Sequence, residues 1–181
     1  GSVWRADRPQ KGRFRQFVQC DIDILGDPTS LAEIELILAT TAALSKICPD
    51  NAFTVRINDR EILKGMALYC GFPEDSMDQV FITLDKMDKI GLEGVEKELL
   101  ESGYQKECVD KYLDMLKNVT RNADGVRALG QKLADVMPLE VSRNLAHIMD
   151  TVTEVSEADF GLEFDPTLVR GMSYYTGTIF E

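Results

Sequence analysis

Residues 168–181 read Leu168-Val-Arg-Gly-Met-Ser-Tyr-Tyr-Thr-Gly-Thr-Ile-Phe-Glu181. The β-branched and aromatic residues of this stretch favour a strand. The stretch also contains Arg170, the adjacent Tyr174 and Tyr175, and two glycines, which allow backbone conformations closed to other residues. A ligand pocket typically combines a cation, hydroxyl-bearing rings and backbone that approaches the ligand closely. The tyrosines also suit an edge strand. On these residues alone both interpretations remain open.

Residues 13–24 alternate in polarity, which predicts a hairpin with one face in the core and one charged face. The charged face has arginines at one end, carboxylates at the other and Gln19 between them. Such a face is usually solvated, but the gradient also matches a zwitterion or a nucleotide-linked amino acid. The expected core face consists of Phe14, Val18, Cys20, Ile22 and Ile24.

The middle of the chain is expected to be mostly helical. A capping box of Ser30 and Glu33 predicts a helix that ends at Cys48-Pro49. A strand at 53–57 precedes a short helix, capped at Asn58-Asp59 and ended by Gly71. Apolar residues at helical spacing then continue from 77 to 138, and one longer helix extends from Val141 and ends by Gly161. The prediction is an α+β fold with an all-helical inserted subdomain, divided into residues 1–75, 76–138 and 139–181.

Composition excludes several classes of protein. No apolar run approaches the roughly 18 residues of a membrane span, and no signal peptide opens the chain. The four cysteines are scattered and His147 is the only histidine, which argues against a metal site and suits a reducing cytosol. The net charge of −11 argues against a broad nucleic-acid-binding face. Residues 1–19 are nevertheless basic, so a local anion site is expected there.

Two stretches together resemble the histidyl-tRNA synthetases. Val3-Trp-Arg-Ala-Asp-Arg-Pro-Gln-Lys-Gly-Arg-Phe-Arg-Gln-Phe-Val-Gln-Cys-Asp-Ile-Asp-Ile-Leu-Gly26 looks like motif 2 of class II synthetases in its histidine-specific form. Residues 168–181 are similar to that family's first histidine-recognition motif. The resemblance implies part of a catalytic core built on an antiparallel sheet, with residues 76–138 as the insertion domain. It also implies a ligase that uses ATP and Mg²⁺ to make histidyl-adenylate and then transfers histidine to tRNA(His).

The resemblance also implies roles for individual residues. Arg5 and Arg170 correspond to the catalytic arginines at the α-phosphate and at the reacting carboxylate. Asp7, which stands where a glutamate is usual, and Arg13 fall with Arg5 among the ATP-binding residues. The expected histidine-binding residues are Gln19 and Asp23 at the α-amino group, Arg170, and Tyr174 and Tyr175 at the imidazole. Ser173 stands where many members have aspartate.

The family's motif 1 is expected before residue 1, and its motif 3 and anticodon-binding domain after residue 181. The chain therefore resembles a piece of a cytoplasmic, homodimeric enzyme, and the 181 residues alone are not expected to form adenylate. Two other functions remain: a histidine-binding paralogue that regulates ATP phosphoribosyltransferase, and a helical interaction module. Arg5, Arg13 and Arg170 argue against the paralogue, because a histidine sensor needs no cations for a triphosphate.

Overall fold

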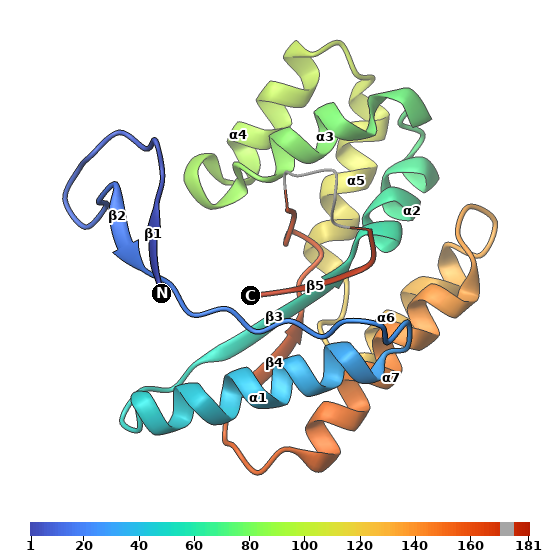
Figure 1. The fold of residues 1–181 in the computed structure, drawn as a ribbon. Coiled ribbons are helices and arrows are strands. Elements are labelled where there is room, and N and C mark those ends of the chain that lie inside the picture. Colours follow the sequence, from blue (N-terminus) through green and yellow to red (C-terminus); the bar gives the residue numbers. More distant parts are fainter. Residues whose placement is uncertain (171–175) are drawn as a thin grey trace.

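The computed structural model describes residues 1–170 and 176–181, and its described strands form two separate sheets (Figure 1). Strands β1 (Ser2–Trp4) and β2 (Gln16–Val18) form an antiparallel hairpin. The second sheet has the order β4-β3-β5, from β3 (Thr54–Asp59), β4 (Gly161–Phe164) and β5 (Thr178–Phe180). β3 pairs parallel with β4 and antiparallel with β5.

The central strand β3 leads directly into helix α2 (Arg60–Cys70). Val55 and Ile57 are buried, as their alternation with polar residues predicts. The Asp59 carboxylate then caps α2 by accepting a hydrogen bond from the Glu61 N–H at 2.8 Å. The helix ends at Gly71, whose left-handed backbone (φ 98°) a glycine adopts without a steric penalty. The predicted boundaries of the helix are confirmed, whereas the strand, predicted at 53–57, extends two residues further, to Asp59.

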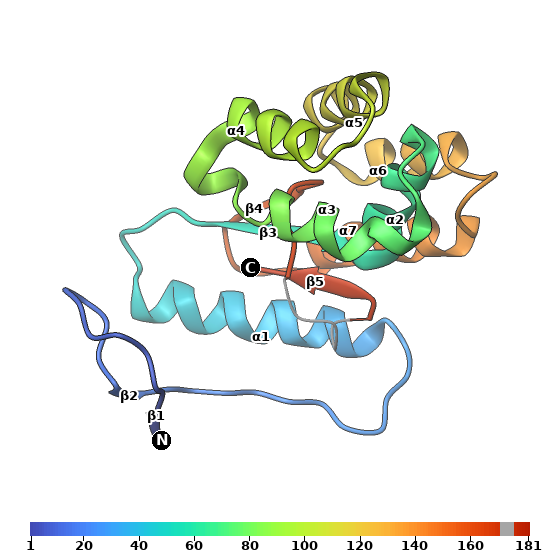
Figure 2. The same cartoon turned by 90° about the horizontal axis from the view of Figure 1, so that it is seen from above.

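Helices surround the three-stranded sheet (Figure 2). α1 lies on one side of the sheet, and α4 and α5 lie on the other. Between α2 and β4 the described elements are η1 (Glu74–Ser76), α3 (Met77–Leu84), α4 (Met87–Glu101), α5 (Lys106–Asn118), α6 (Ala123–Lys132) and α7 (Leu139–Val155); α1 spans Leu31–Ile47. α6 and α7 approach closely at Gly130, where a Cβ atom would overlap the Oγ and Cβ atoms of Ser142.

Buried apolar side chains from the sheet and from all seven described α-helices form one hydrophobic cluster. Ile57 on β3, Val126 on α6 and Leu145 on α7 are fully buried in it. The predicted α+β class is confirmed, and the described sheet adds one parallel strand pair. The division at residues 75 and 138 stays a prediction.

The predicted core face of the hairpin is wrong. Phe14, Val18, Cys20 and Ile22 are exposed, and Ile24 is half-buried. Among the described residues, β1 and β2 pair only with each other, in the register Ser2↔Val18, and the predicted core face of this hairpin is exposed. Phe17, expected on the charged face, is the half-buried residue of β2.

Three predicted element boundaries also differ from the structure. The Ser30–Glu33 capping box does not form, and the Thr29 hydroxyl accepts the Leu31 N–H at 3.3 Å instead. α7 ends at Val155, well before Gly161, which starts β4. The strand expected over 168–181 is limited, among described residues, to β5. Residues 168–170 are not a strand, because side chains rather than a neighbouring strand bind the carbonyls of Leu168 and Arg170.

Candidate functional site

The hairpin brings together four of the predicted site residues in two pairs. The Arg5 guanidinium donates to the Gln19 amide oxygen at 2.9 Å and lies over the Phe17 ring, 4.9 Å from its centroid. The Arg13 guanidinium lies 3.8 Å from the Asp7 carboxylate. Arg5 directly follows β1, and its backbone faces Arg15, whereas Gln19 faces Gly1. The Arg5 side chain therefore reaches Gln19 by crossing over the ring of Phe17, which lies between them on β2.

The loop between β1 and β2 is a basic, exposed feature. Arg8, Lys11 and Arg15 lie on it in addition to the site arginines, and all are exposed. The Arg15 Nε atom donates to the Asp7 carbonyl at 3.3 Å. Because exposed guanidiniums bind phosphate through several donors at little desolvation cost, this loop suits an anion with several oxygens. The local anion site stays a prediction, and the structure adds that the cations of this loop are exposed.

Gln19 and the acidic residues that follow it give this basic region a negative end. The Gln19 amide nitrogen donates to the Asp21 carboxylate. Asp23, the predicted contact of an α-amino group, is exposed on the segment that leads from the hairpin to α1. This order of charge along the chain matches a ligand that carries an anionic and a cationic group.

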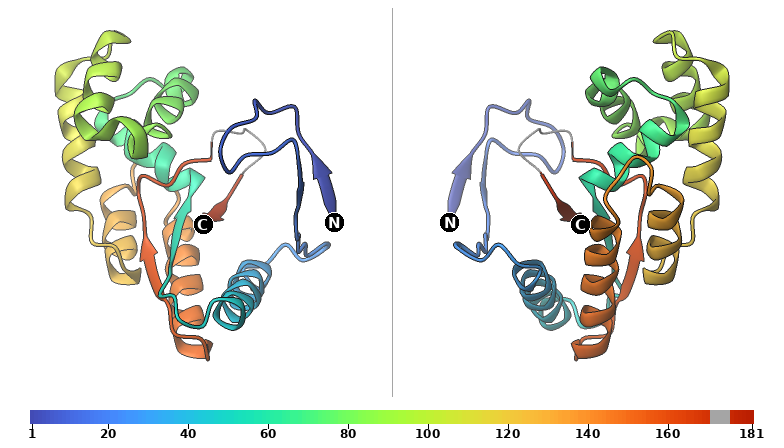
Figure 3. Two further views of the ribbon diagram at one scale, coloured as in Figure 1. Left: turned by 90° about the vertical axis from the view of Figure 1, so that its left-hand side faces the viewer. Right: turned by 90° about the vertical axis from the view of Figure 1, so that its right-hand side faces the viewer.

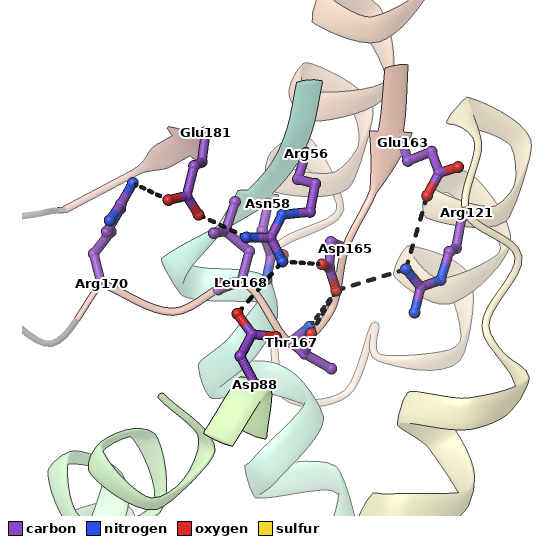
Figure 4. A network of polar contacts seen from close by, with 10 residues as sticks. All are labelled: Arg56, Asn58, Asp88, Arg121, Glu163, Asp165, Thr167, Leu168, Arg170 and Glu181. Atoms are coloured by element: carbon purple, nitrogen blue, oxygen red, sulfur yellow. Dashed lines mark hydrogen bonds and ion pairs between the residues drawn. The ribbon is translucent and has the colours of Figure 1, made fainter. Parts of the chain in front are cut away.

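Arg170 lies in a second group of charged residues, at the edge of the three-stranded sheet (Figure 4). Its guanidinium is 3.4 Å from Oε1 of Glu181, while Oε2 of Glu181 is 2.7 Å from the guanidinium of Arg56. Arg56 also lies 3.3 Å from Asp165 and 3.9 Å from Asp88. Burial opposes the charge on Arg56, but the attraction of Asp165, Glu181 and Asp88 outweighs it, so the pKa of this guanidinium is raised.

The carboxylate of Asp165 is the buried centre of this group, with 3% of its side chain exposed. Its Oδ1 atom accepts from the N–H and the hydroxyl of Thr167, at 2.9 and 2.7 Å. Arg121 approaches it from the segment before α6, at 3.9 Å. Both carboxylate oxygens of Asp165 thus have partners in a buried position, so its side chain is a fixed anchor for both arginines.

A small cavity of about 150 Å³ lies beside the same residues. Arg56, Arg170 and Glu181 line it together with Asp88 and residues 167–169. Its polar lining suits a few water molecules or a small polar group rather than an apolar ligand.

The structure thus divides the predicted residues between two places. The hairpin stands apart from the three-stranded sheet, on the side of β5 and the chain's C-terminal residue (Figure 3). Arg5, Asp7, Arg13 and Gln19 lie on the hairpin, and Arg170 lies by β5. The predictions for Tyr174 and Tyr175 fall outside the described residues.

Arg56, Asp165 and Glu181 were missed as site residues. Arg56 was visible in the sequence only as a polar position in an alternating strand. Glu181 belongs to the quoted stretch but had no assigned role. Their proximity depends on strand pairing across 125 residues of sequence between Arg56 and Glu181, which no local pattern reports.

The described residues contain no group of three or more His, Cys, Asp or Glu side chains that could hold a metal ion. None of the described helices is long and apolar enough to cross a membrane.

Comparisons with known proteins give consistent matches over the whole chain. A family model described as histidyl-tRNA synthetase matches residues 1–181. The histidine–tRNA ligase of Leifsonia xyli subsp. xyli is 41% identical over 195 residues, which cover 99% of this chain and 42% of that protein. The probable histidine–tRNA ligase of Tropheryma whipplei strain Twist is 41% identical over 191 residues, which cover 100% of this chain and 44% of that protein.

Solved structures agree with these relatives. The histidyl-tRNA synthetase from Nostoc sp. PCC 7120 has a TM-score of 0.75 and 27% identity, and the match covers 100% of this chain and 42% of that one. An ATP phosphoribosyltransferase regulatory subunit/histidyl-tRNA synthetase from Bacillus halodurans C has a TM-score of 0.58, over 86% of this chain and 40% of that one. At 24% identity it is similar in fold alone. The chain spans less than half the length of each of these proteins.

Proposed function

Because the chain belongs to the histidyl-tRNA synthetase family, we propose that it supplies part of the active site of a histidine–tRNA ligase. The ligase would activate histidine with ATP and then transfer it to tRNA(His). The observation that carries the proposal is the match of the family model to all 181 residues, together with relatives named histidine–tRNA ligase at 41% identity.

The adenylation reaction explains why arginines are the expected catalytic groups. The histidine carboxylate attacks the α-phosphate, and negative charge gathers on the phosphate oxygens in the transition state. Fixed guanidiniums stabilise that charge, and we assign this role to Arg5 and Arg170. No general base is required, since the carboxylate is already ionised at neutral pH.

The pairing of Arg5 with Gln19 supports the assignment of adjacent subsites. In an aminoacyl-adenylate the α-amino group lies only a few bonds from the phosphorus atom. The residue that binds the phosphate and the residue that binds the amino group must therefore be neighbours, as Arg5 and Gln19 are at 2.9 Å. Asp23 would add a carboxylate for the ammonium group.

The remaining assignments extend the same site. Arg13 would bind ATP, with Asp7 orienting it or contacting the ribose or adenine; their 3.8 Å separation supports a joint role. Tyr174 and Tyr175 would line the imidazole pocket. Bound Mg²⁺ would neutralise phosphate charge in such a ligase. The described residues provide no cluster of three or more ligands for the ion, so Mg²⁺ is assigned to no residue.

We further propose residues 76–138 as an insertion domain between core segments 1–75 and 139–181, in a cytoplasmic, homodimeric ligase. The described elements between β3 and β4 are all helical, which supports a helical insertion in this part of the chain. Contact with tRNA from this region would need local cations such as Lys117, Arg121 and Arg127. Arg121 already pairs with Glu163 at 3.8 Å, and Arg127 pairs with Asp124 and Asp150. We therefore expect any such contact to be weak.

Histidine-dependent exchange of pyrophosphate into ATP, measured on the full-length protein, tests the proposal. Exchange that requires histidine, followed by charging of tRNA(His), is the expected result. Calorimetric titration with ATP and with histidine separates the alternatives: the ligase binds both, a histidine-sensing regulatory subunit binds histidine only, and a helical interaction module binds neither. Binding of histidine without ATP, and without exchange, would overturn the proposal.

A further inference from the structure

Glu181 shares its carboxylate between two arginines, one oxygen for each. Oε1 lies 3.4 Å from Arg170 and Oε2 lies 2.7 Å from Arg56 (Figure 4). The backbones of Arg56 and Glu181 are fixed opposite each other by two hydrogen bonds, at 2.8 and 2.9 Å. Directly opposed residues of an antiparallel pair project from the same face of the sheet, so this side-chain contact follows from the strand pairing.

Arg56 is itself held from the other side. Asp165, with 3% of its side chain exposed, lies 3.3 Å from its guanidinium, and Thr167 fixes that carboxylate through two hydrogen bonds. The Asp165 N–H donates to the Ile57 carbonyl at 2.9 Å, which joins this segment to β3. A continuous chain of polar contacts therefore runs from the buried Asp165 through Arg56 and Glu181 to Arg170.

The backbone that carries Arg170 is anchored by separate contacts. The Asn58 amide, which is fully buried, donates to the Leu168 carbonyl at 3.1 Å. The Arg60 guanidinium donates to the carbonyl of Arg170 at 3.1 Å. These contacts fix the main chain, but they leave the direction of the Arg170 side chain to be determined by its own partner, Glu181.

We propose that Glu181 and Arg56 are positioning residues for the adenylation step: Glu181 aims the guanidinium of Arg170, and Arg56 holds Glu181 in place. This inference rests on the proposed function, because it assigns a task to Arg170 in that reaction. Arg56 has a second effect. By sharing the Glu181 carboxylate it leaves Arg170 incompletely neutralised, and therefore able to attract the developing negative charge.

The sheet offers a matched control for Glu181. Glu163 on β4 stands opposite Arg56 on the other side of β3, in the register Arg56↔Glu163. Its side chain is 50% exposed, against 48% for Glu181, but it pairs with Arg121 instead of Arg170. Glu163→Gln and Glu181→Gln thus remove the same charge from similarly exposed positions, but only Glu181→Gln removes a carboxylate that pairs with Arg170.

The first measurement is pyrophosphate exchange by the full-length protein. Glu181→Gln should lower kcat about ten-fold and leave the KM for histidine within about two-fold, because misaimed catalytic groups cost rate more than binding. Arg56→Met should act in the same direction, with part of the loss recovered in Arg56→Lys. Glu163→Gln should keep kcat within about two-fold of that of the protein without substitutions.

An Arg170→Ala background separates positioning from a general structural effect. If Glu181 acts through Arg170, Glu181→Gln should cause no further loss of kcat in that background. A second readout needs no catalysis. Modification of Arg170 by phenylglyoxal, mapped by mass spectrometry, should be about two- to five-fold faster in Glu181→Gln, as for loss of one exposed ion pair, and unchanged in Glu163→Gln.

The results that would overturn the positioning role differ from those that would overturn the proposed function. Unchanged kcat in Glu181→Gln, equal losses in Glu163→Gln, or an undiminished loss in the Arg170→Ala background would each overturn the positioning role in an active enzyme. If the unmodified protein shows no histidine-dependent exchange, the proposed function fails and the adenylation role fails with it. The modification rates then report only whether the Glu181–Arg170 pair exists.

Discussion

Substitution of Gly130 by alanine tests the close packing of α6 on α7. The added Cβ would overlap both the Oγ and the Cβ atoms of Ser142, so rotation of the serine hydroxyl cannot relieve it. Overpacking of a well-packed site costs typically about 1–3 kcal/mol. Alanine in a helix recovers up to about 1 kcal/mol relative to glycine. The expected net loss is about 1–2 kcal/mol, which lowers the melting temperature by about 2–8 °C for a chain of this size.

The double variant Gly130→Ala/Ser142→Gly provides the control. It removes both overlapping atoms and leaves the Cα atom of residue 142 at 3.9 Å, an ordinary contact. Ser142→Gly alone should destabilise, because it removes the hydrogen bond to the Leu139 carbonyl at 3.0 Å and places glycine in a helix. Thermal unfolding followed by circular dichroism should show a favourable coupling of about 1 kcal/mol or more between the two sites. Additive effects, or a Gly130→Ala variant as stable as the unmodified chain, would refute this reasoning.

Three further predictions concern charge. Arg170→Ala in the full-length protein should lower the kcat of adenylation by about 10²-fold, with a smaller effect on histidine binding; a raised KM with unchanged kcat would show that Arg170 only binds substrate. Burial raises the pKa of the Asp59 carboxyl above its value in the unfolded chain, so the folded protein binds this proton more readily. The free energy of unfolding therefore falls as the pH rises from the unfolded pKa to the folded pKa. Asp59→Asn keeps the cap and should therefore be at least as stable at pH 7 in chemical denaturation, with the advantage lost in acid; lower stability at pH 7 would contradict this. Replacing Lys117, Arg121 and Arg127 by alanine should flatten the salt dependence of tRNA charging by about one unit of log–log slope rather than three, because two of them are already paired; a change of three units would show that all three contact phosphate.

The sequence predicted best where a local rule had no competitor. The alternation of Val55 and Ile57 with polar residues fits a buried central strand, and Asp59 and Gly71 mark the ends of the next helix with their own caps. At Ser30 a local rule did have a competitor. Thr29, tied to Asp27 by its own hydrogen bonds, took the role of capping the helix.

Burial and long-range pairing could not be predicted in the same way. The alternation of Phe14 and Val18 predicts two different faces, but it does not say whether another layer covers either of them. In this structure the face that is partly covered is the opposite one, where the Arg5 guanidinium lies over the ring of Phe17. The motif identified Arg170 from its neighbours in sequence, whereas its partner Glu181 requires knowledge of how β5 returns to β3.

The parallel pairing of β3 with β4 has a consequence for how the protein folds. Arg56 and Asp165 meet across 109 residues of sequence, and Arg56 and Glu181 across 125. Closing a loop of that length is entropically costly, so contacts between distant strands form slowly unless the intervening chain has already condensed. The helices between the two strands are built from local contacts and can form first, bringing β4 back to β3. On this order of events the Glu181 carboxylate reaches Arg170 only after the intervening helices have formed, so the site is assembled late.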